Sequence, residues 1–191
     1  MLVSGALHDS RGAIFPALKS TGLEDEEVRR AWAAMRYGAW EIETLLATWQ
    51  AYVVRQGVWQ ASQHAGYYTK AVDLTAYWRP GLKGLKSKHY DAEADKALPA
   101  VVLGMVGCVG RVGEQRMALL TDLMRADLTD PSETSLPTQL LQQVALQLAH
   151  DEMPVLDAGF KLKALHAAGL ERCVVRLAKN FTARRNFLPE Y

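Results

Sequence analysis

The sequence predicts an α/β (α+β) protein, with a small N-terminal helical bundle followed by a mixed β-sheet with flanking helices. Residues 20–69 show helical periodicity, and after Lys70 the pattern changes to short apolar, β-branched runs. Two further helical stretches separate the later runs. With 191 residues, 49% of them hydrophobic, the chain is long enough to bury a core. We therefore expect a helical domain over residues 1–69 and a sheet domain over residues 70–191.

Two apolar stripes at helical spacing run through the N-terminal region, and Gly38 and Gly57 are the expected helix ends. The stretch "TGLE", Thr21 to Glu24, has the pattern of a capping box. In such a box, a threonine hydroxyl and a glutamate three residues later each bind a backbone N–H group. Four tryptophans are expected in the core of this bundle: Trp32, Trp40, Trp49 and Trp59.

From Lys70 onward, the apolar runs predict five strands, over residues 71–77, 97–109, 115–124, 153–157 and 171–179. Residues 81–96 and 126–135 are expected loops. A helix is expected to begin after Ser135, with Pro137 in its first turn, and another over residues 160–169. The first three strands can run antiparallel, and helices link the later ones. This order predicts a mixed sheet with helices on its faces.

The net charge of +1 is unevenly distributed along the chain. Residues 70–90 carry five basic side chains and one acidic one, and residues 158–191 carry seven basic and two acidic ones. Basic segments of this kind attract polyanions such as nucleic acid, although solvated basic faces are an equal alternative. Cys108 and Cys173 stand apart in apolar sequence, which is typical of reduced thiols in a cytoplasmic protein. No apolar run is long enough for a membrane helix, and the N-terminus lacks a signal-peptide pattern.

Asp73 and Asp157 are the candidate site residues. Asp73 interrupts the apolar run 71–77, and Asp157 ends the run 153–157. A buried carboxylate is costly unless it is paired or binds a metal. If the two strands are neighbours, both carboxylates can reach one or two shared Mg²⁺ or Mn²⁺ ions. A turn, a helix cap or a solvated edge strand would explain either aspartate alone, but both positions together with the basic flanks favour a metal site.

The segments "AVDLTAYWRP" (71–80), "PVLDAGF" (154–160) and "CVVRLAKN" (173–180) resemble the catalytic core of DDE-type insertion-sequence transposases. The resemblance covers about residues 70–182. It implies an RNase H-like fold in which Asp73 and Asp157 bind Mg²⁺ or Mn²⁺ and catalyse DNA-strand cleavage and transfer. It also implies transposon-end and target DNA as partners, a homodimer, and a DNA-binding or accessory role for residues 1–69. The expected location is the cytoplasm, at the nucleoid when DNA is bound.

Several other residues are candidates for contact with DNA. Thr75 shares a strand face with Asp73 and can support it or touch substrate, although β-propensity also explains a threonine there. Basic residues near the two aspartates, or where the resemblance places basic groups near DNA, are Arg79, Lys83, Arg176, Lys179, Arg184 and Arg185. Phosphate binding and simple solvation are both open for Arg79 and Lys83.

One departure from the family concerns its third acid, a glutamate on a helix well downstream of the last strand. Glu190 follows too soon and has no helical pattern around it. We therefore expect the chain to be the N-terminal part of a transposase, inactive or nearly so in DNA cleavage by itself. An aspartyl-nucleophile phosphatase is disfavoured because Thr75 stands where its second acid should be. The remaining alternative is an inactive DNA-binding relic or repressor acting at transposon ends.

Overall fold

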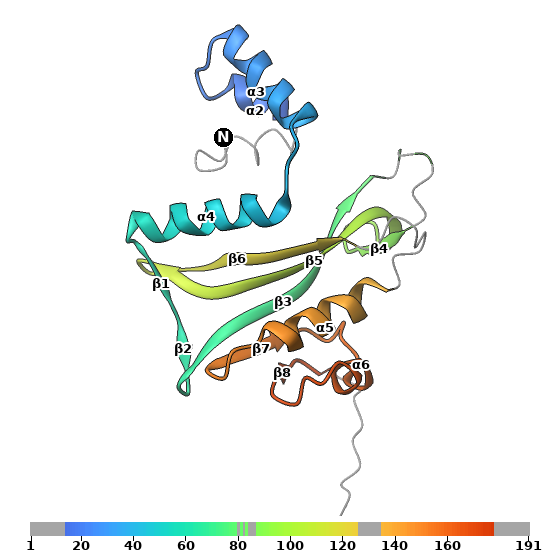
Figure 1. The fold of residues 1–191 in the computed structure, drawn as a ribbon. Helices are drawn as coiled ribbons and strands as arrows, with labels where there is room; N and C mark the ends of the chain where they lie inside the picture. The colour runs from blue at the N-terminus through green and yellow to red at the C-terminus, as the bar shows by residue number, and fades with distance from the viewer. Residues whose placement is uncertain (1–13, 80, 82, 84–86, 126–134, 178–191) are drawn as a thin grey trace, which may run out of the picture. The chain divides into compact units, whose positions relative to one another are not determined.

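The computed structural model describes residues 14–79, 81, 83, 87–125 and 135–177 (Figure 1). The described chain has a mixed α+β fold, with several helices and a curled, open, mixed β-sheet. It divides into two compact units, Met1–Leu45 and Leu46–Tyr191. The division falls well before residue 69, where the sequence placed it, because residues 59–69 belong to the sheet.

In the first unit, α2 (Ile14–Lys19) packs against α3 (Asp25–Tyr37). Ala17 and Val28 are fully buried between them, and the rings of Phe15 and Trp32 meet edge to face. The third helix, α4 (Ile42–Gln56), spans the division between the two units. The helix ends expected at Gly38 and Gly57 are confirmed.

The capping box predicted at Thr21 is wrong. The Thr21 hydroxyl instead donates to the Leu18 carbonyl at 2.6 Å and closes the end of α2. Gly22 then turns the chain with φ +79°, and Glu24 is extended with ψ 152°, so α3 begins at Asp25. The box lies three residues later, where the backbone N–H of Glu24 donates to the Glu27 carboxylate at 3.1 Å.

Two of the four tryptophans do not form the expected helical core. Trp40 is 58% exposed, and its indole N–H donates to the Ala34 carbonyl at 2.9 Å. Trp59 lies on a strand, β1 (Trp59–Ala61), and its indole N–H donates to the Met117 carbonyl at 3.1 Å. Its ring lies where a side chain on Gly110 would be, so it belongs to the sheet unit.

The helical interpretation of residues 58–69 is therefore wrong. β1 is followed by β2 (Gln63–His64) and β3 (Tyr67–Trp78). Ala65 and Gly66 join β2 to β3, and both have positive φ, of 50° and 85°. Such a two-residue hairpin matches the right-handed twist of the strands that it connects.

The rest of the sheet consists of β4 (Lys88–Asp91), β5 (Lys96–Val112), β6 (Gln115–Arg125), β7 (Glu152–Leu156) and β8 (Val174–Val175). β3 is antiparallel to β5, and β5 is antiparallel to β6. On its other side, β3 is parallel to β7, which is parallel to β8. β4 also pairs with β5, so the loop expected over residues 81–96 contains a strand. The strand expected over residues 171–179 is much shorter than predicted.

The core of the second unit lies between the sheet and α5 (Leu136–Gln147), which begins after Ser135 as expected. Leu140 and Leu141 of α5 are almost completely buried against β3, β5 and β7. Gly104 of β5 permits this close packing, because a Cβ there would lie 3.0 Å from the Leu140 side chain. The last helix, α6 (Leu162–Ala167), adds Leu165 to the core. None of the helices in the described ranges has both the length and the apolarity needed to cross a membrane.

Candidate functional site

Asp73 and Asp157 occupy adjacent positions at the end of one ladder. The last pair of the parallel β3–β7 ladder is Val72 with Leu156, and the two aspartates are the next residues along the chain. Val72 and Leu156 are each 2% exposed and point into the core. Because side chains alternate along a strand, Asp73 points to the opposite face, where it is exposed; Asp157 is exposed as well.

Both carboxylates are oriented by backbone N–H groups. One oxygen of Asp73, Oδ1, accepts a hydrogen bond from the Leu74 N–H at 2.8 Å. The Oδ1 of Asp157 accepts one from the Gly159 N–H at 2.9 Å. A Cβ on Gly159 would lie 3.0 Å from this same Oδ1, so glycine leaves room for the carboxylate. Within the described part of the chain, neither aspartate forms an ion pair.

Arg176 extends the same row of residues. The β7–β8 ladder ends with the pair Leu156–Val175, and Arg176 follows it directly. Its backbone N–H donates to the Leu156 carbonyl at 3.0 Å, which continues the strand pairing by one residue. The strands β3, β7 and β8 are neighbours and run parallel. The residues that directly follow the last pairs of their two ladders are Asp73, Asp157 and Arg176. Arg176 is thus the basic residue of this row, and its side chain is exposed.

Some of the other residues predicted to contact DNA lie on β3 beyond Asp73 or just after that strand. Thr75 lies two residues on, on the same face as Asp73, and is half-buried. Arg79 follows the end of β3, and its guanidinium lies 3.8 Å from the centre of the Tyr77 ring. Lys83 is exposed. The predicted residues Lys179, Arg184 and Arg185 lie outside the described residues.

The residues present fit a hard divalent cation. Mg²⁺ is commonly held by one or two carboxylates, with water and substrate phosphates completing its shell. Asp73 and Asp157 each keep one carboxylate oxygen, Oδ2, without a hydrogen-bond partner among the described residues. No group of three His, Cys, Asp or Glu side chains suited to a metal occurs in that part of the chain. Among the described residues, this position therefore offers two carboxylates to a cation and no third acidic, His or Cys side chain.

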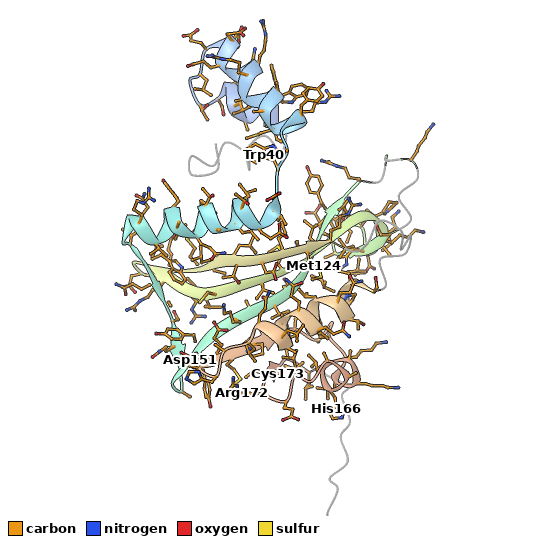
Figure 2. All side chains as sticks on the ribbon, viewed as in Figure 1. Trp40, Met124, Asp151, His166, Arg172 and Cys173 are labelled. Atoms are coloured by element: carbon orange, nitrogen blue, oxygen red, sulfur yellow. The ribbon has the colours of Figure 1, made fainter. Side chains whose placement is uncertain are left out.

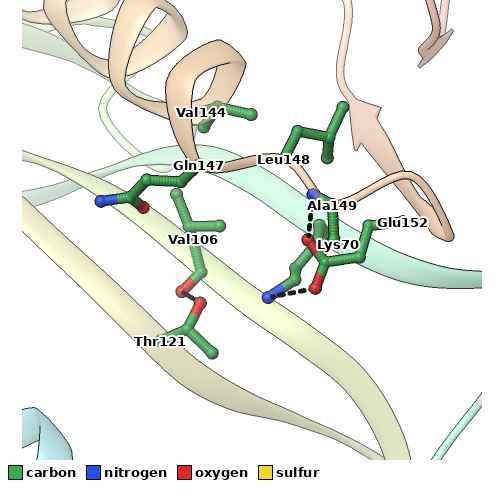
Figure 3. Close-up of a pocket in the computed structure, with 8 residues that line it drawn as sticks. All are labelled: Lys70, Val106, Thr121, Val144, Gln147, Leu148, Ala149 and Glu152. Carbon is green, nitrogen blue, oxygen red and sulfur yellow. Dashed lines mark hydrogen bonds and ion pairs between the residues drawn. The ribbon is translucent and has the colours of Figure 1, made fainter.

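An ion pair that the sequence did not indicate lies on the opposite face of β3 (Figure 3). Lys70 Nζ is 3.0 Å from Glu152 Oε1, with side-chain exposures of 17% and 20%. The other oxygen of Glu152, Oε2, accepts a hydrogen bond from the Ala149 N–H at 3.1 Å. These groups border a pocket of about 180 Å³, to which Thr121 and Gln147 also contribute.

Cys108 is the register partner of Lys70 on β5. Burial raises the pKa of the Cys108 thiol above its ordinary value, and the nearby Lys70 charge lowers it by a smaller amount. Burial also raises the pKa of Cys173. Neither thiol is therefore activated as a nucleophile, which agrees with their interpretation as core cysteines.

A larger hollow, of about 1070 Å³, lies toward the beginning of β3. Its apolar lining comes from β5, β7 and β8, and Thr69 of β3 also lines it. The apolar residues are Val109, Met153, Val155 and Val174. Thr69 shares a face with Asp73, because the two are four residues apart on one strand. The hollow and the carboxylates therefore lie on the same face of the sheet.

Three other titratable side chains are labelled in Figure 2: Asp151 and Arg172 near the start of β7, and His166 on α6. Arg172 donates to the Ala149 carbonyl at 2.8 Å, and its guanidinium lies 5.2 Å from the centre of the Tyr67 ring. Arg172 thus ties the segment before β8 to the turn that leads into β7. His166 on α6 is exposed.

Comparison of the chain with protein-family models, curated proteins and solved structures gave no match.

Proposed function

We propose that this chain carries the two-aspartate part of an RNase H-like transposase core, which cleaves and transfers DNA strands with a divalent cation. The observation that carries this proposal is the register that places Asp73 beside Asp157. The strand order supports it as well. When the short strands β1, β2 and β4 are set aside, β3 is the first strand and β7 is the fourth. Asp73 then lies on the first strand and Asp157 follows the fourth, as the transposase resemblance implies.

In this proposal, Asp73 and Asp157 hold Mg²⁺ or Mn²⁺ through their carboxylates. The bound cation supplies Lewis-acid polarisation of a phosphodiester oxygen. Arg176, next in the row, offers a guanidinium to the phosphate, and such groups favour bidentate phosphate contacts. Thr75, two residues beyond Asp73 on the same face, supports Asp73 or contacts substrate in this proposal. DNA is the proposed substrate because Arg176 follows in the same row as the two acids, and Arg79 adds a second positive charge farther along, about 20 Å from Asp73 by the strand rise.

Cation binding by the purified chain tests the site. In a calorimetric titration, the wild-type chain is expected to bind Mn²⁺. Asp73→Asn and Asp157→Asn should each weaken that binding about tenfold or more. Glu171→Gln, at an exposed acid outside the row, is the matched control and should bind Mn²⁺ as the wild type does. Mn²⁺ binding that neither aspartate variant alters would overturn the proposal.

A second candidate is DNA binding without cleavage, by a protein that occupies transposon ends. The two-ligand site among the described residues favours it, because a metal pair needs more carboxylate oxygens than two aspartates supply. A gel-shift assay distinguishes the candidates. A transposase core should bind duplex DNA more tightly with Mn²⁺ than in EDTA, and Asp73→Asn should remove the difference. DNA binding that is equal in Mn²⁺ and EDTA, and unchanged by Asp73→Asn, favours the second candidate.

A further inference from the structure

A stripe of four side chains runs from the candidate site to the end of β3. Its members alternate along the chain and therefore share one face: Asp73, Thr75, Tyr77 and Arg79. Tyr77 is 40% exposed, and the Arg79 guanidinium lies 3.8 Å from the centre of its ring. An arginine at this distance makes a cation–π contact, which holds both groups in place.

The stripe continues across β5 onto β4. Tyr77 pairs with Val101, Lys88 with Pro99 and Tyr90 with Ala97. Residues 97, 99 and 101 alternate along β5, so their partners Tyr90, Lys88 and Tyr77 share one face of the sheet. The backbone N–H of Arg79 donates to the Pro99 carbonyl at 2.8 Å. Arg79 and Lys88 therefore flank Pro99, about 10 Å apart by the usual strand spacing.

This surface presents two exposed tyrosine rings and two cations, Arg79 and Lys88, and the Asp95 carboxylate lies beside Tyr90. Tyr90 is 56% exposed, and its hydroxyl donates to the Asp95 carboxylate, which fixes the ring. Asp91 turns its carboxylate toward the backbone N–H groups of Glu93 and Ala94. Exposed rings bind unstacked bases, and neighbouring Arg and Lys groups bind the phosphates between them. Duplex DNA hides its base faces, so these rings suit an unpaired strand.

We propose that Tyr77 and Arg79, with Lys88 and Tyr90 beside them, bind an unpaired segment of a DNA strand that leads to the phosphodiester held at Asp73 and Asp157. The inference rests on the proposed function for the position of that phosphodiester. The stacking surface itself depends only on the exposed rings and cations. Tyr77 lies about 13 Å from Asp73 along the strand, so the bound bases flank the reacting phosphate and do not cover it.

The test is DNA binding in the presence of EDTA, which removes any contribution from divalent metal ions. The probes are a blunt DNA duplex and the same duplex with a four-nucleotide overhang, at the 3′ or the 5′ end, that contains 2-aminopurine. We expect the wild-type chain to bind one overhang about tenfold more tightly than the blunt duplex, with quenching of 2-aminopurine by stacking. Tyr77→Ala should abolish both the preference and the quenching, and Tyr77→Phe should keep both.

Two further variants complete the design. Arg79→Ala should weaken binding of every probe, because it removes a phosphate contact and the support of the Tyr77 ring. Tyr52→Ala, at a tyrosine of α4 that is 45% exposed, should behave as the wild type does. Absence of an overhang preference, or a preference that survives Tyr77→Ala, overturns the inference. Tighter binding of an RNA overhang than of the DNA overhang overturns the assignment to DNA.

The same set separates this inference from the proposed function. If Asp73→Asn changes no cation binding while Tyr77→Ala still abolishes the overhang preference, the two-aspartate site fails and the stacking surface stands. If Asp73→Asn loses Mn²⁺ binding while Tyr77→Ala leaves overhang binding unchanged, the stacking surface fails and the metal site stands.

Discussion

Asp73 and Asp157 each follow the last pair of one parallel ladder, Val72 with Leu156, so their adjacency depends on the register between β3 and β7. A shift of one residue would turn the buried Val72 or Leu156 to the exposed face and carry an aspartate into the core. Burial of those two side chains therefore specifies the register. The candidate site is thus a consequence of packing on the other face of the sheet.

The Lys70–Glu152 ion pair is expected to reinforce that register. It joins β3 to β7 near the beginning of their ladder, with Nζ and Oε1 3.0 Å apart and both side chains mostly buried. Lys70→Met or Glu152→Gln should each lower the free energy of unfolding by about 1–3 kcal/mol, because the partner is left uncompensated. Urea denaturation measures this change.

The double variant Lys70→Met/Glu152→Gln should be closer to the wild type than the sum of the two single changes. The Lys19–Asp25 pair is the control. Its side chains are largely exposed, and Lys19→Met should cost less than about 1 kcal/mol. Additive effects of the Lys70 and Glu152 changes would contradict a stabilising pair.

Gly104 is expected to be intolerant of any side chain. A Cβ there would lie 3.0–3.4 Å from three carbon atoms of Leu140, which is fully enclosed and cannot move aside. Gly104→Ala should destabilise the protein by about 1–3 kcal/mol in thermal or chemical unfolding. Gly81→Ala, where nothing lies within 4 Å, should be nearly neutral. Because the clash requires Leu140, Gly104→Ala should cost less in a Leu140→Ala background; an equal cost there would refute this explanation.

Gly159 is predicted to act as a positioning residue for Asp157. Gly159→Ala leaves the carboxylate in the chain but places a Cβ 3.0 Å from its Oδ1. We expect Mn²⁺ affinity to fall about tenfold, with a change in unfolding free energy below about 0.5 kcal/mol at this exposed site. Calorimetric Mn²⁺ titration together with thermal unfolding measures both quantities. Unchanged affinity would show that the carboxylate does not need this space.

The two cysteines predict a loss of stability at alkaline pH. Burial raises the pKa of Cys108 and of Cys173 above 9.0 in the folded protein. A raised folded-state pKa contributes stability below the unfolded pKa, and this contribution is lost as the pH rises through the folded pKa. Unfolding free energy should therefore fall as the pH rises above the ordinary thiol pKa of about 8.5. The variant Cys108→Ala/Cys173→Ala should fall less over that range, and an identical fall in both proteins would contradict the prediction.

Much of the second unit could be predicted from the pattern of residues. The strands containing Asp73, Val106 and Leu119, the helix after Ser135, and the short strand before Asp157 all occur where the sequence placed them. Long apolar runs and a well-marked helix start are local signals. The wrong assignments are the helix expected around Trp59 and the loop expected where β4 lies. Both segments are short strands that depend on pairing with β5.

The hairpin at Ala65–Gly66 had a local signal that the helical interpretation overlooked. A glycine at the second position of a two-residue connection, followed by the tyrosines of a strand, is typical of such turns. The capping box was misplaced for a comparable reason. Its pattern occurs at Thr21, but the turn at Gly22 moves the start of α3 beyond it.

The sequence by itself determined the long strands of the sheet and the two aspartates as its candidate site, because apolar runs and isolated charges can be recognised locally. Only the tertiary structure decided that Arg176 stands in the same row, that Lys70 pairs with Glu152, and that Tyr77 shares a face with Tyr90. These relationships join segments far apart along the chain. They follow from strand register. Between β3 and β7, that register is specified by burial of Val72 and Leu156 against α5 and not by the residues at the site.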